Sequence, residues 1–227
     1  MEKEHSGGQA FKMKNVYIYC EGPTEESFVN ELLYPYFFNL GIYVFPIVCT
    51  SKRTSEIKLR GGVSTFGKIR KELTMLCKSH PHEYVTTMFD YYAMPAETPE
   101  IRFQDADIFN RTDHVEEAIE KELALPNLKF HFMLHEFEGI LFSRPESFLM
   151  IADERTVDAI RKIRDAFPTP EHINNSYETA PSRRLSQIIP GYAKIRHGTI
   201  LSKDMGIDVI MEQCPHFRKW IREIAAL

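Results

Sequence analysis

Four carboxylates follow predicted strands in a pattern that suits a hard metal ion. Glu21 comes directly after the first apolar run of the chain, Asp90 ends a later run of the same kind, and Glu136 and Glu138 follow the next one. Because ligands bind at the carboxyl ends of the strands of a parallel sheet, we expect these side chains to converge on one edge. Oxygen ligands without cysteine favour Mg²⁺ or Mn²⁺ over zinc. Such an ion can orient a phosphate and activate water.

Each of these carboxylates, taken alone, also has a structural interpretation as a helix cap or a surface ion pair. Glu25, in the first turn of a predicted helix, fits that interpretation well. For Glu21 and Asp90 together a functional role is the better interpretation, because perturbed acids gather at functional sites. For Glu136 and Glu138 both interpretations stay open, since carboxylates two residues apart at a helix start cannot point the same way.

Two groups of basic residues lie in loops that glycine or proline flank, where proteins commonly contact phosphates. We expect the second group to face the carboxylates, because arginine forks and helix N-terminal amides both suit phosphate oxygens. The alternatives are ion pairs with acids of the helical section and, for a lone histidine, a structural role. The residues predicted to contact nucleic acid or phosphate are Lys52, Arg53, Arg60, Arg183, Arg184, Lys194, Arg196 and His197.

The elements that would position these residues alternate between short apolar runs and amphipathic segments. This pattern predicts an α/β fold with a parallel sheet flanked by helices and a helical C-terminal section. Pro35 should kink the first helix, Asp113 with Glu116 resembles a capping box at the start of a later one, and Pro215 starts the last. The predicted strands cover residues 16–20, 42–48, 84–89 and 129–134.

Composition narrows the class of protein. The chain has 227 residues, a net charge of −4, and four cysteines that are far apart in the sequence, which disfavours a zinc ribbon or a secreted disulfide framework. No apolar run reaches the length of a membrane span, so we expect a cytoplasmic protein without a membrane partner. Residues 1–12 are interpreted as a disordered leader or an expression remnant, residues 13–145 as the α/β domain, and residues 146–227 as a helical section packed on it.

Several segments, in order, resemble one family. EGPTEESFV, VTTMFDYYAMP, LHEFEGILFS, APSRRLSQIIPGY and CPHFRKWI are similar to DUF4276, a bacterial family of Toprim-like proteins, and the similarity spans residues 14–224. Related Toprim proteins, the overcoming-lysogenization-defect (OLD) nucleases, are Mg²⁺-dependent nucleases that work with an ATPase in phage defence. The resemblance implies that Glu21 is the acid/base glutamate and Asp90 the first metal ligand.

One departure from the Toprim pattern bears on activity. Toprim domains carry Asp-x-Asp after the third strand, whereas Asp90, Tyr91 and Tyr92 supply only one acid here. Either Glu136 or Glu138 replaces the missing ligand, or the site binds metal weakly and is inert.

Two functional hypotheses follow from these residues and this resemblance. The first is a metal-dependent nuclease that acts with a partner ATPase of the AAA or ABC type in bacterial phage defence. The second is a non-catalytic Toprim-like module that docks to an ATPase or to nucleic acid. In either case Tyr91 and Tyr92 could form a base-stacking wall or a protein-docking surface, and a homodimer is among the expected assemblies.

Overall fold

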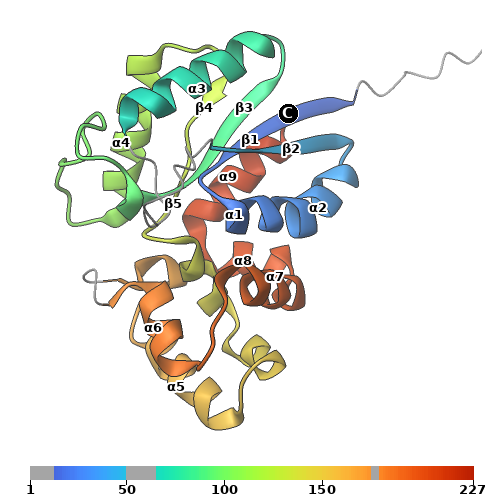
Figure 1. Ribbon diagram of the computed structural model, residues 1–227, viewed down its shortest axis with the longest axis vertical. Coiled ribbons are helices and arrows are strands. Elements are labelled where there is room, and N and C mark those ends of the chain that lie inside the picture. Colours follow the sequence, from blue (N-terminus) through green and yellow to red (C-terminus); the bar gives the residue numbers. More distant parts are fainter. Residues whose placement is uncertain (1–12, 50–64, 175–178) are drawn as a thin grey trace, which may run out of the picture.

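A parallel sheet forms the centre of the protein (Figure 1). The computed structural model describes residues 13–49, 65–174 and 179–227. The strand order is β2-β1-β3-β4, and β5 also pairs with β3, with every pairing parallel. The strands are β1 (Lys14–Cys20), β2 (Ile42–Val48), β3 (Tyr84–Asp90), β4 (Leu128–Lys129) and β5 (Phe132–Met133). The predicted fold class, a parallel sheet flanked by helices with a helical C-terminal section, is confirmed.

The last predicted strand is interrupted. In place of one strand over residues 129–134, two short strands pair with β3 and leave Phe130 and His131 between them. The Thr87 hydroxyl bridges this gap, because Oγ1 accepts the His131 N–H at 2.8 Å and donates to the His131 carbonyl at 2.8 Å. A side chain thus satisfies the backbone groups that a regular ladder would have paired.

Helices cover both faces of the sheet because successive residues of a strand point to opposite sides. Val16 and Ile18 of β1 lie in the core beneath α1 (Pro23–Phe28), α2 (Tyr34–Phe38) and α9 (Pro215–Ala225). Tyr19 lies in the opposite core, under α3 (Phe66–Ser79) and α4 (Ile108–Leu123). Figure 1 shows α3 and α4 on one side of the strands and α1, α2 and α9 on the other.

Two sequence predictions about helix ends had different outcomes. The kink or split predicted at Pro35 corresponds to a continuous helical stretch in which the π-helix Val29–Leu33 lies between α1 and α2, with Pro35 in the first turn of α2. The predicted start at Asp113 is wrong, because α4 begins at Ile108 and Asp113 lies inside it. Asp107 is the actual N-cap, and its Oδ1 accepts the Phe109 N–H at 2.8 Å. The Asp-x-x-Glu pattern was therefore part of a helix interior.

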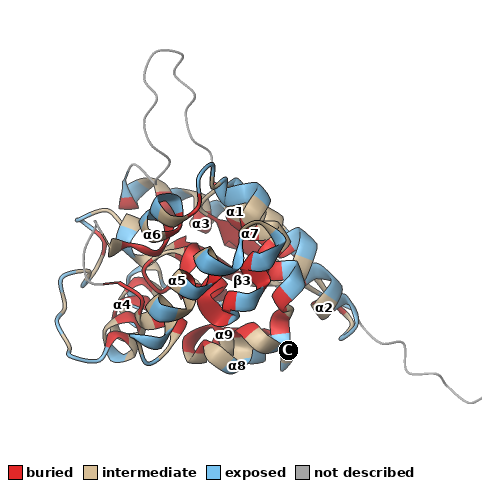
Figure 2. Cartoon of the chain, turned by 90° about the horizontal axis from the view of Figure 1, so that it is seen from below, coloured by how far each residue is buried: buried red, intermediate tan, exposed pale blue. Residues whose placement is uncertain are grey.

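The helical C-terminal section shares a core with the sheet. It follows the 3-10 helices Phe137–Ser143 and Pro145–Met150, and Figure 1 shows α5 to α8 below the strands. Figure 2 shows buried residues where β3, α9 and the surrounding helices meet, and exposed residues on the outer surfaces. Apolar side chains of both parts, from Val16 to Trp220, belong to one buried cluster. The remaining helices are α5 (Glu154–Asp165), α6 (Pro181–Ile188), α7 (Lys194–Met205) and α8 (Ile207–Gln213).

Two further observations concern the expected class of protein. Among the helices of the described ranges, none combines the length and apolar character that a membrane span requires. Cys20, Cys49, Cys77 and Cys214 are all buried and free of disulfide bonds. The predicted leader, residues 1–12, lies outside the described residues.

Candidate metal site

Glu21 and Asp90 meet at the carboxyl edge of the sheet. Glu21 directly follows β1, and Asp90 ends the adjacent strand β3. The Glu21 backbone N–H donates to the Met88 carbonyl at 3.2 Å, which continues the pairing of the two strands. The Glu21 side chain then turns across to β3, where Oε2 accepts the Asp90 N–H at 3.2 Å. The parallel topology therefore brings these two acids into direct contact through one backbone amide.

The segment after β5 brings Glu136 and Glu138 to the same edge. Asp90 Oδ1 accepts the N–H of Phe137, the residue between them, at 2.8 Å. Glu136 Oε2 accepts the N–H of Ser182, in the first turn of α6, at 3.0 Å. Glu138 is buried, and the Lys194 Nζ at the start of α7 lies 3.0 Å from its Oε1. The two glutamates thus point to different helices, as their spacing of two residues requires.

Glu25 joins this cluster, although its sequence position predicted only a capping role. It does cap the helix, since its Oε2 accepts the Gly22 N–H at 2.9 Å. Its side chain is also buried, and burial with the charges of Glu21 and Glu138 raises the pKa of Glu25 to about 7. The spacing of four residues between Glu21 and Glu25, across the turn from strand to helix, was the signal that could have identified it.

The cluster holds more negative charge than its surroundings compensate. Burial, followed by the charges of Glu21, Glu25 and Glu138, raises the pKa of Asp90 well above its usual range. Burial also raises the pKa of Glu21 and that of Glu138. Buried carboxylates without sufficient counter-charge take up protons or a cation, because the ionised form loses hydration.

Lys194 supplies a positive charge at the edge of this group of acids, where its side chain is 48% exposed. Although burial by itself lowers the pKa of Lys194, the charges of Glu138, Glu136 and Asp90 raise it above its ordinary value. The ion pair with Glu138 leaves both of that carboxylate's oxygens without a regular hydrogen bond in the described part of the chain. Lys194 was predicted to contact phosphate, and the structure places it against the carboxylates.

The other predicted phosphate contacts are distributed differently. Arg184 has a structural partner, because its Nε donates to the Thr179 carbonyl at 2.6 Å and its guanidinium lies 5.5 Å from the centre of the Phe167 ring. His197 accepts the Ala193 N–H on Nδ1 at 3.1 Å, at the first turn of α7. Arg183 and Arg196 are exposed near the N-termini of α6 and α7. The residues of the first basic loop, Lys52, Arg53 and Arg60, lie outside the described residues.

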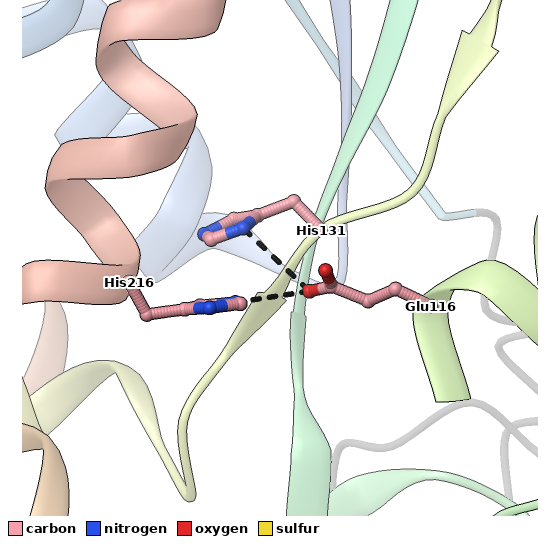
Figure 3. Close-up of side chains that lie close together, drawn as sticks. All are labelled: Glu116, His131 and His216. Atoms are coloured by element: carbon pink, nitrogen blue, oxygen red, sulfur yellow. Dashed lines mark hydrogen bonds and ion pairs between the residues drawn. The ribbon is translucent and has the colours of Figure 1, made fainter. Parts of the chain in front are cut away.

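A second, separate group of buried ligand-type side chains joins α4, the β4–β5 gap and α9 (Figure 3). Glu116 Oε1 lies 3.0 Å from His216 Nε2 and 3.7 Å from His131 Nδ1. This spacing could hold a metal ion. The two imidazoles are stacked, however, with centroids 4.8 Å apart and planes at 18°. Because the nitrogen lone pairs lie in the ring planes, one ring would have to turn before both could bind one ion.

In its present arrangement this group is an ion-pair network. His216 Nδ1 lies 3.6 Å from Asp113 Oδ1, and Glu171 accepts the backbone N–H groups of His216 and Phe217 at 3.0 and 2.9 Å. Although burial by itself lowers the pKa of His216, the charges of Glu116, Glu171 and Asp113 raise it above its ordinary value. Burial lowers the pKa of His131 well below its usual range. These opposite directions favour the positive charge on His216 and a neutral His131, whose ring lies between those of His216 and Trp220.

The two histidines should make opposite contributions to the pH dependence of stability. The folded pKa of His216 is raised, so its stabilising effect is complete below the unfolded pKa of about 6.5 and is lost as pH rises through the folded pKa. We expect His216→Gln to lower the free energy of unfolding by roughly 1.5–3 kcal/mol at pH 6, with a smaller loss at higher pH. Urea unfolding of variant and parent between pH 5.5 and 9 measures this difference.

His131→Gln is the matched control, because the contribution of His131 to stability should change with pH in the opposite direction to that of His216. The folded pKa of His131 is lowered, so the stability that the neutral ring confers is present above about pH 6.5 and is lost as pH falls. The difference between parent and His131→Gln should therefore shrink toward acid. Equal slopes for the two variants would contradict this assignment of the charge.

Comparisons with known proteins identify a family and two solved structures that resemble the chain. Residues 20–225 match the family described as "Domain of unknown function (DUF4276)". No curated protein matches the chain. The chain is similar to a solved structure of the C-terminal region of the Xanthomonas campestris pv. campestris OLD protein, phased with iodine. The identity is 17%, the alignment covers 94% of this chain and 98% of that one, and the TM-score is 0.40. A mercury-phased structure of the same region gives 18% identity, the same coverage and a TM-score of 0.38.

Proposed function

This chain belongs to the DUF4276 family, and we propose that it is a nuclease of the Toprim type that hydrolyses phosphodiesters with Mg²⁺ or Mn²⁺. The observation that carries the proposal is the convergence of acids on one edge of a parallel sheet, Glu25 and Glu138 buried and Glu21, Asp90 and Glu136 half-buried, with Lys194 as their counter-charge. A purely structural cluster would need compensation for each buried charge, because removing a carboxylate from water costs several kcal/mol. Carboxylate pairs that repel one another instead mark sites that bind cations or transfer protons.

The carboxylate oxygens of the cluster are donors of the type that a hard cation prefers. Asp90 and Glu138 would hold the ion, with Glu25 and Glu136 as further oxygen donors directly or through water. Mg²⁺ commonly keeps several waters and one or two carboxylates, so not every acid needs to contact it. When bound, the ion supplies charge for the phosphate oxygens and lowers the pKa of an attacking water.

Glu21 is proposed as the residue that moves a proton. Its pKa is raised by burial, so it exchanges protons closer to neutral pH than an exposed glutamate, as general acid–base catalysis requires. Its hydrogen bond to the Asp90 amide holds the carboxylate at the edge of the sheet. Lys194, once a cation neutralises Glu138, would be available for a substrate phosphate, together with the exposed Arg196.

The proposal includes a partner and a setting. The resemblance of the sequence segments to relatives of the OLD nucleases supports a cytoplasmic role with an ATPase of the AAA or ABC type in bacterial phage defence. Dependence on a partner would restrain a nuclease that could otherwise cut the host's nucleic acid.

A second candidate function rests on one observation. Tyr92 stands where the Toprim pattern has its second aspartate, and its ring stacks on His135 with centroids 5.0 Å apart. With one ligand replaced by a tyrosine, the alternative is a Toprim-like module that binds nucleic acid or an ATPase without cutting.

Metal binding tests the site directly. We expect the parent chain to bind Mn²⁺, and Glu138→Gln to weaken this binding at least about tenfold, because it removes a buried donor charge. Glu146→Gln is the matched control, since Glu146 is an exposed glutamate that pairs with Arg161 at 2.9 Å. Titration calorimetry measures the affinities. Equal affinity in Glu138→Gln and Glu146→Gln would reject the carboxylate site.

Cleavage separates the two candidate functions. The parent chain, with and without a co-expressed ATPase, is incubated with single- and double-stranded DNA and RNA in Mg²⁺, Mn²⁺ or chelator. Metal-dependent cleavage supports the nuclease. Nucleic-acid binding without cleavage under every condition supports the binding module.

A further inference from the structure

Tyr92 lies beside the carboxylate cluster and has an exposed ring. The proposed chemistry gives this ring no role. It lies two residues after Asp90, in the 3-10 helix Tyr91–Ala93. Its neighbour Tyr91 turns inward and meets the Phe132 ring edge-on at 5.4 Å. The Tyr92 side chain, by contrast, is 52% exposed. The short helix therefore packs one ring against the core and leaves the next at the surface.

A buried histidine supports the Tyr92 ring from one side. The two rings are stacked, with centroids 5.0 Å apart and planes at 29°, and the Tyr92 N–H donates to the His135 carbonyl at 3.3 Å. His135 is only 7% exposed, and its Nδ1 has no hydrogen-bond partner in the described part of the chain. His135 covers one face of the Tyr92 ring, and the Tyr91 ring lies nearby at 81° to it, with centroids 6.4 Å apart. Half of Tyr92 nevertheless stays exposed.

His135 has an unusual backbone conformation next to this stack. Its φ is +64°, in the left-handed region that residues with a Cβ rarely adopt. Such strain costs roughly 1–3 kcal/mol, persists where the surrounding structure fixes the backbone, and is common at functional sites. His135 also directly precedes Glu136. Both members of the stack are therefore fixed, through short stretches of backbone, to acids of the cluster.

A single exposed ring favours a small planar ligand over a protein partner. Protein-docking surfaces are contiguous apolar patches of several hundred Å², and a single ring does not make one. A nucleobase, in contrast, needs only one aromatic face on which to stack.

We propose that Tyr92, stacked on His135, is a platform on which an unpaired nucleobase stacks. This base would lie next to the phosphodiester that the carboxylate site hydrolyses. This inference rests on the proposed function, because it takes the cluster as the place where the phosphate binds. A base that stacks on a protein ring must leave its own stack, so the platform favours single-stranded or frayed nucleic acid over an intact duplex. Tyr92 is a positioning residue in this account.

The test compares the ring with a side chain of similar bulk that cannot stack. Binding of a fluorescein-labelled oligothymidylate, and of an abasic oligonucleotide of equal length, is measured in Ca²⁺ for the parent, Tyr92→Phe and Tyr92→Leu. We expect Tyr92→Leu to weaken oligothymidylate binding about 5- to 150-fold, with no change for the abasic strand. Tyr92→Phe, which keeps the ring, should bind both as the parent does.

The outcomes separate this inference from the nuclease proposal. Equal binding of both strands by the parent, or equal losses in Tyr92→Phe and Tyr92→Leu, would overturn the platform. Mn²⁺ affinity is measured on the same variants and should not change. Intact base-dependent binding combined with absent cleavage would reject the nuclease while supporting the platform.

Discussion

Replacing Glu21 by glutamine is expected to reduce metal-dependent cleavage about 10²- to 10⁴-fold while the protein stays folded. Glutamine preserves the shape of the side chain and can still accept the hydrogen bond from the Asp90 amide, which is 3.2 Å from Glu21 Oε2. It cannot donate or remove a proton near neutral pH. Initial rates with saturating Mg²⁺, and with any required ATPase present, measure this effect.

The same substitution should leave the metal-free protein as stable as the parent or more so. Glu21 contributes to the raised pKa of Asp90 and of Glu25, which means that the charges of these buried and half-buried acids oppose one another. Removing one of them relieves repulsion, and we expect a gain of roughly 0.5–2 kcal/mol in the free energy of unfolding, as is common where function and stability conflict. Urea unfolding in chelator measures it.

Glu83→Gln is the control for this pair of measurements. Glu83 precedes β3 at the opposite, amino end of the sheet and accepts a hydrogen bond from Asn15 Nδ2 at 3.2 Å. The chemical change is identical, but no acid cluster surrounds it, so neither rate nor stability should rise or fall substantially. Parental cleavage by Glu21→Gln would reject its role in proton transfer, and a large loss of stability would reject the account of mutual repulsion.

Replacing Trp220 by alanine should give the largest loss of stability, about 3–5 kcal/mol in the free energy of unfolding. The indole is 1% exposed, lies parallel to the His131 ring at 4.4 Å, and donates from Nε1 to Thr86 Oγ1 at 2.9 Å. Since Thr86 lies in β3 and Trp220 in α9, this side chain connects the last helix to the centre of the sheet. A loss of this size is a large share of the 5–15 kcal/mol that stabilises a typical domain.

Trp220→Phe separates packing from hydrogen bonding. Phenylalanine keeps a ring against His131 but leaves the Thr86 hydroxyl without its donor, which should cost about 1–3 kcal/mol. Because the core is shared between the sheet and the helical section, each variant should unfold in a single transition, followed by circular dichroism in urea. Two separate transitions, or an alanine variant no weaker than the phenylalanine variant, would contradict this account.

Local patterns in the sequence were sufficient to predict the sheet and the position of its first two acids. The second strand was predicted at its observed bounds, residues 42–48, because a short β-branched run between a glycine and a polar loop has few alternatives. Glu21 and Asp90 could be placed together because parallel strands align their carboxyl ends at one edge. Register and sheet order were not needed for that step.

The tertiary structure alone decided which side chains are buried together. The capping role of Glu25 is local, but its burial against Glu21 and Glu138 depends on how α1 packs over the sheet. Lys194 reaches Glu138 only because α7 begins beside the segment that follows β5. The cationic runs looked alike in the sequence, and nothing local distinguished Lys194, which counters a buried acid, from Arg184, which supports a loop carbonyl.

Contacts between residues far apart in the sequence also explain the gap between β4 and β5 and the histidine network beside it. The apolar run of residues 129–134 predicts one strand, whereas the hydroxyl of Thr87, more than forty residues earlier, pairs with the His131 backbone and divides it. Glu116, His131 and His216 lie in three different elements, so no spacing along the chain could reveal their contact. Periodicity and turn chemistry act between neighbours in sequence and therefore determine the elements. Burial, charge pairing and pKa depend on residues that only the folded chain brings together.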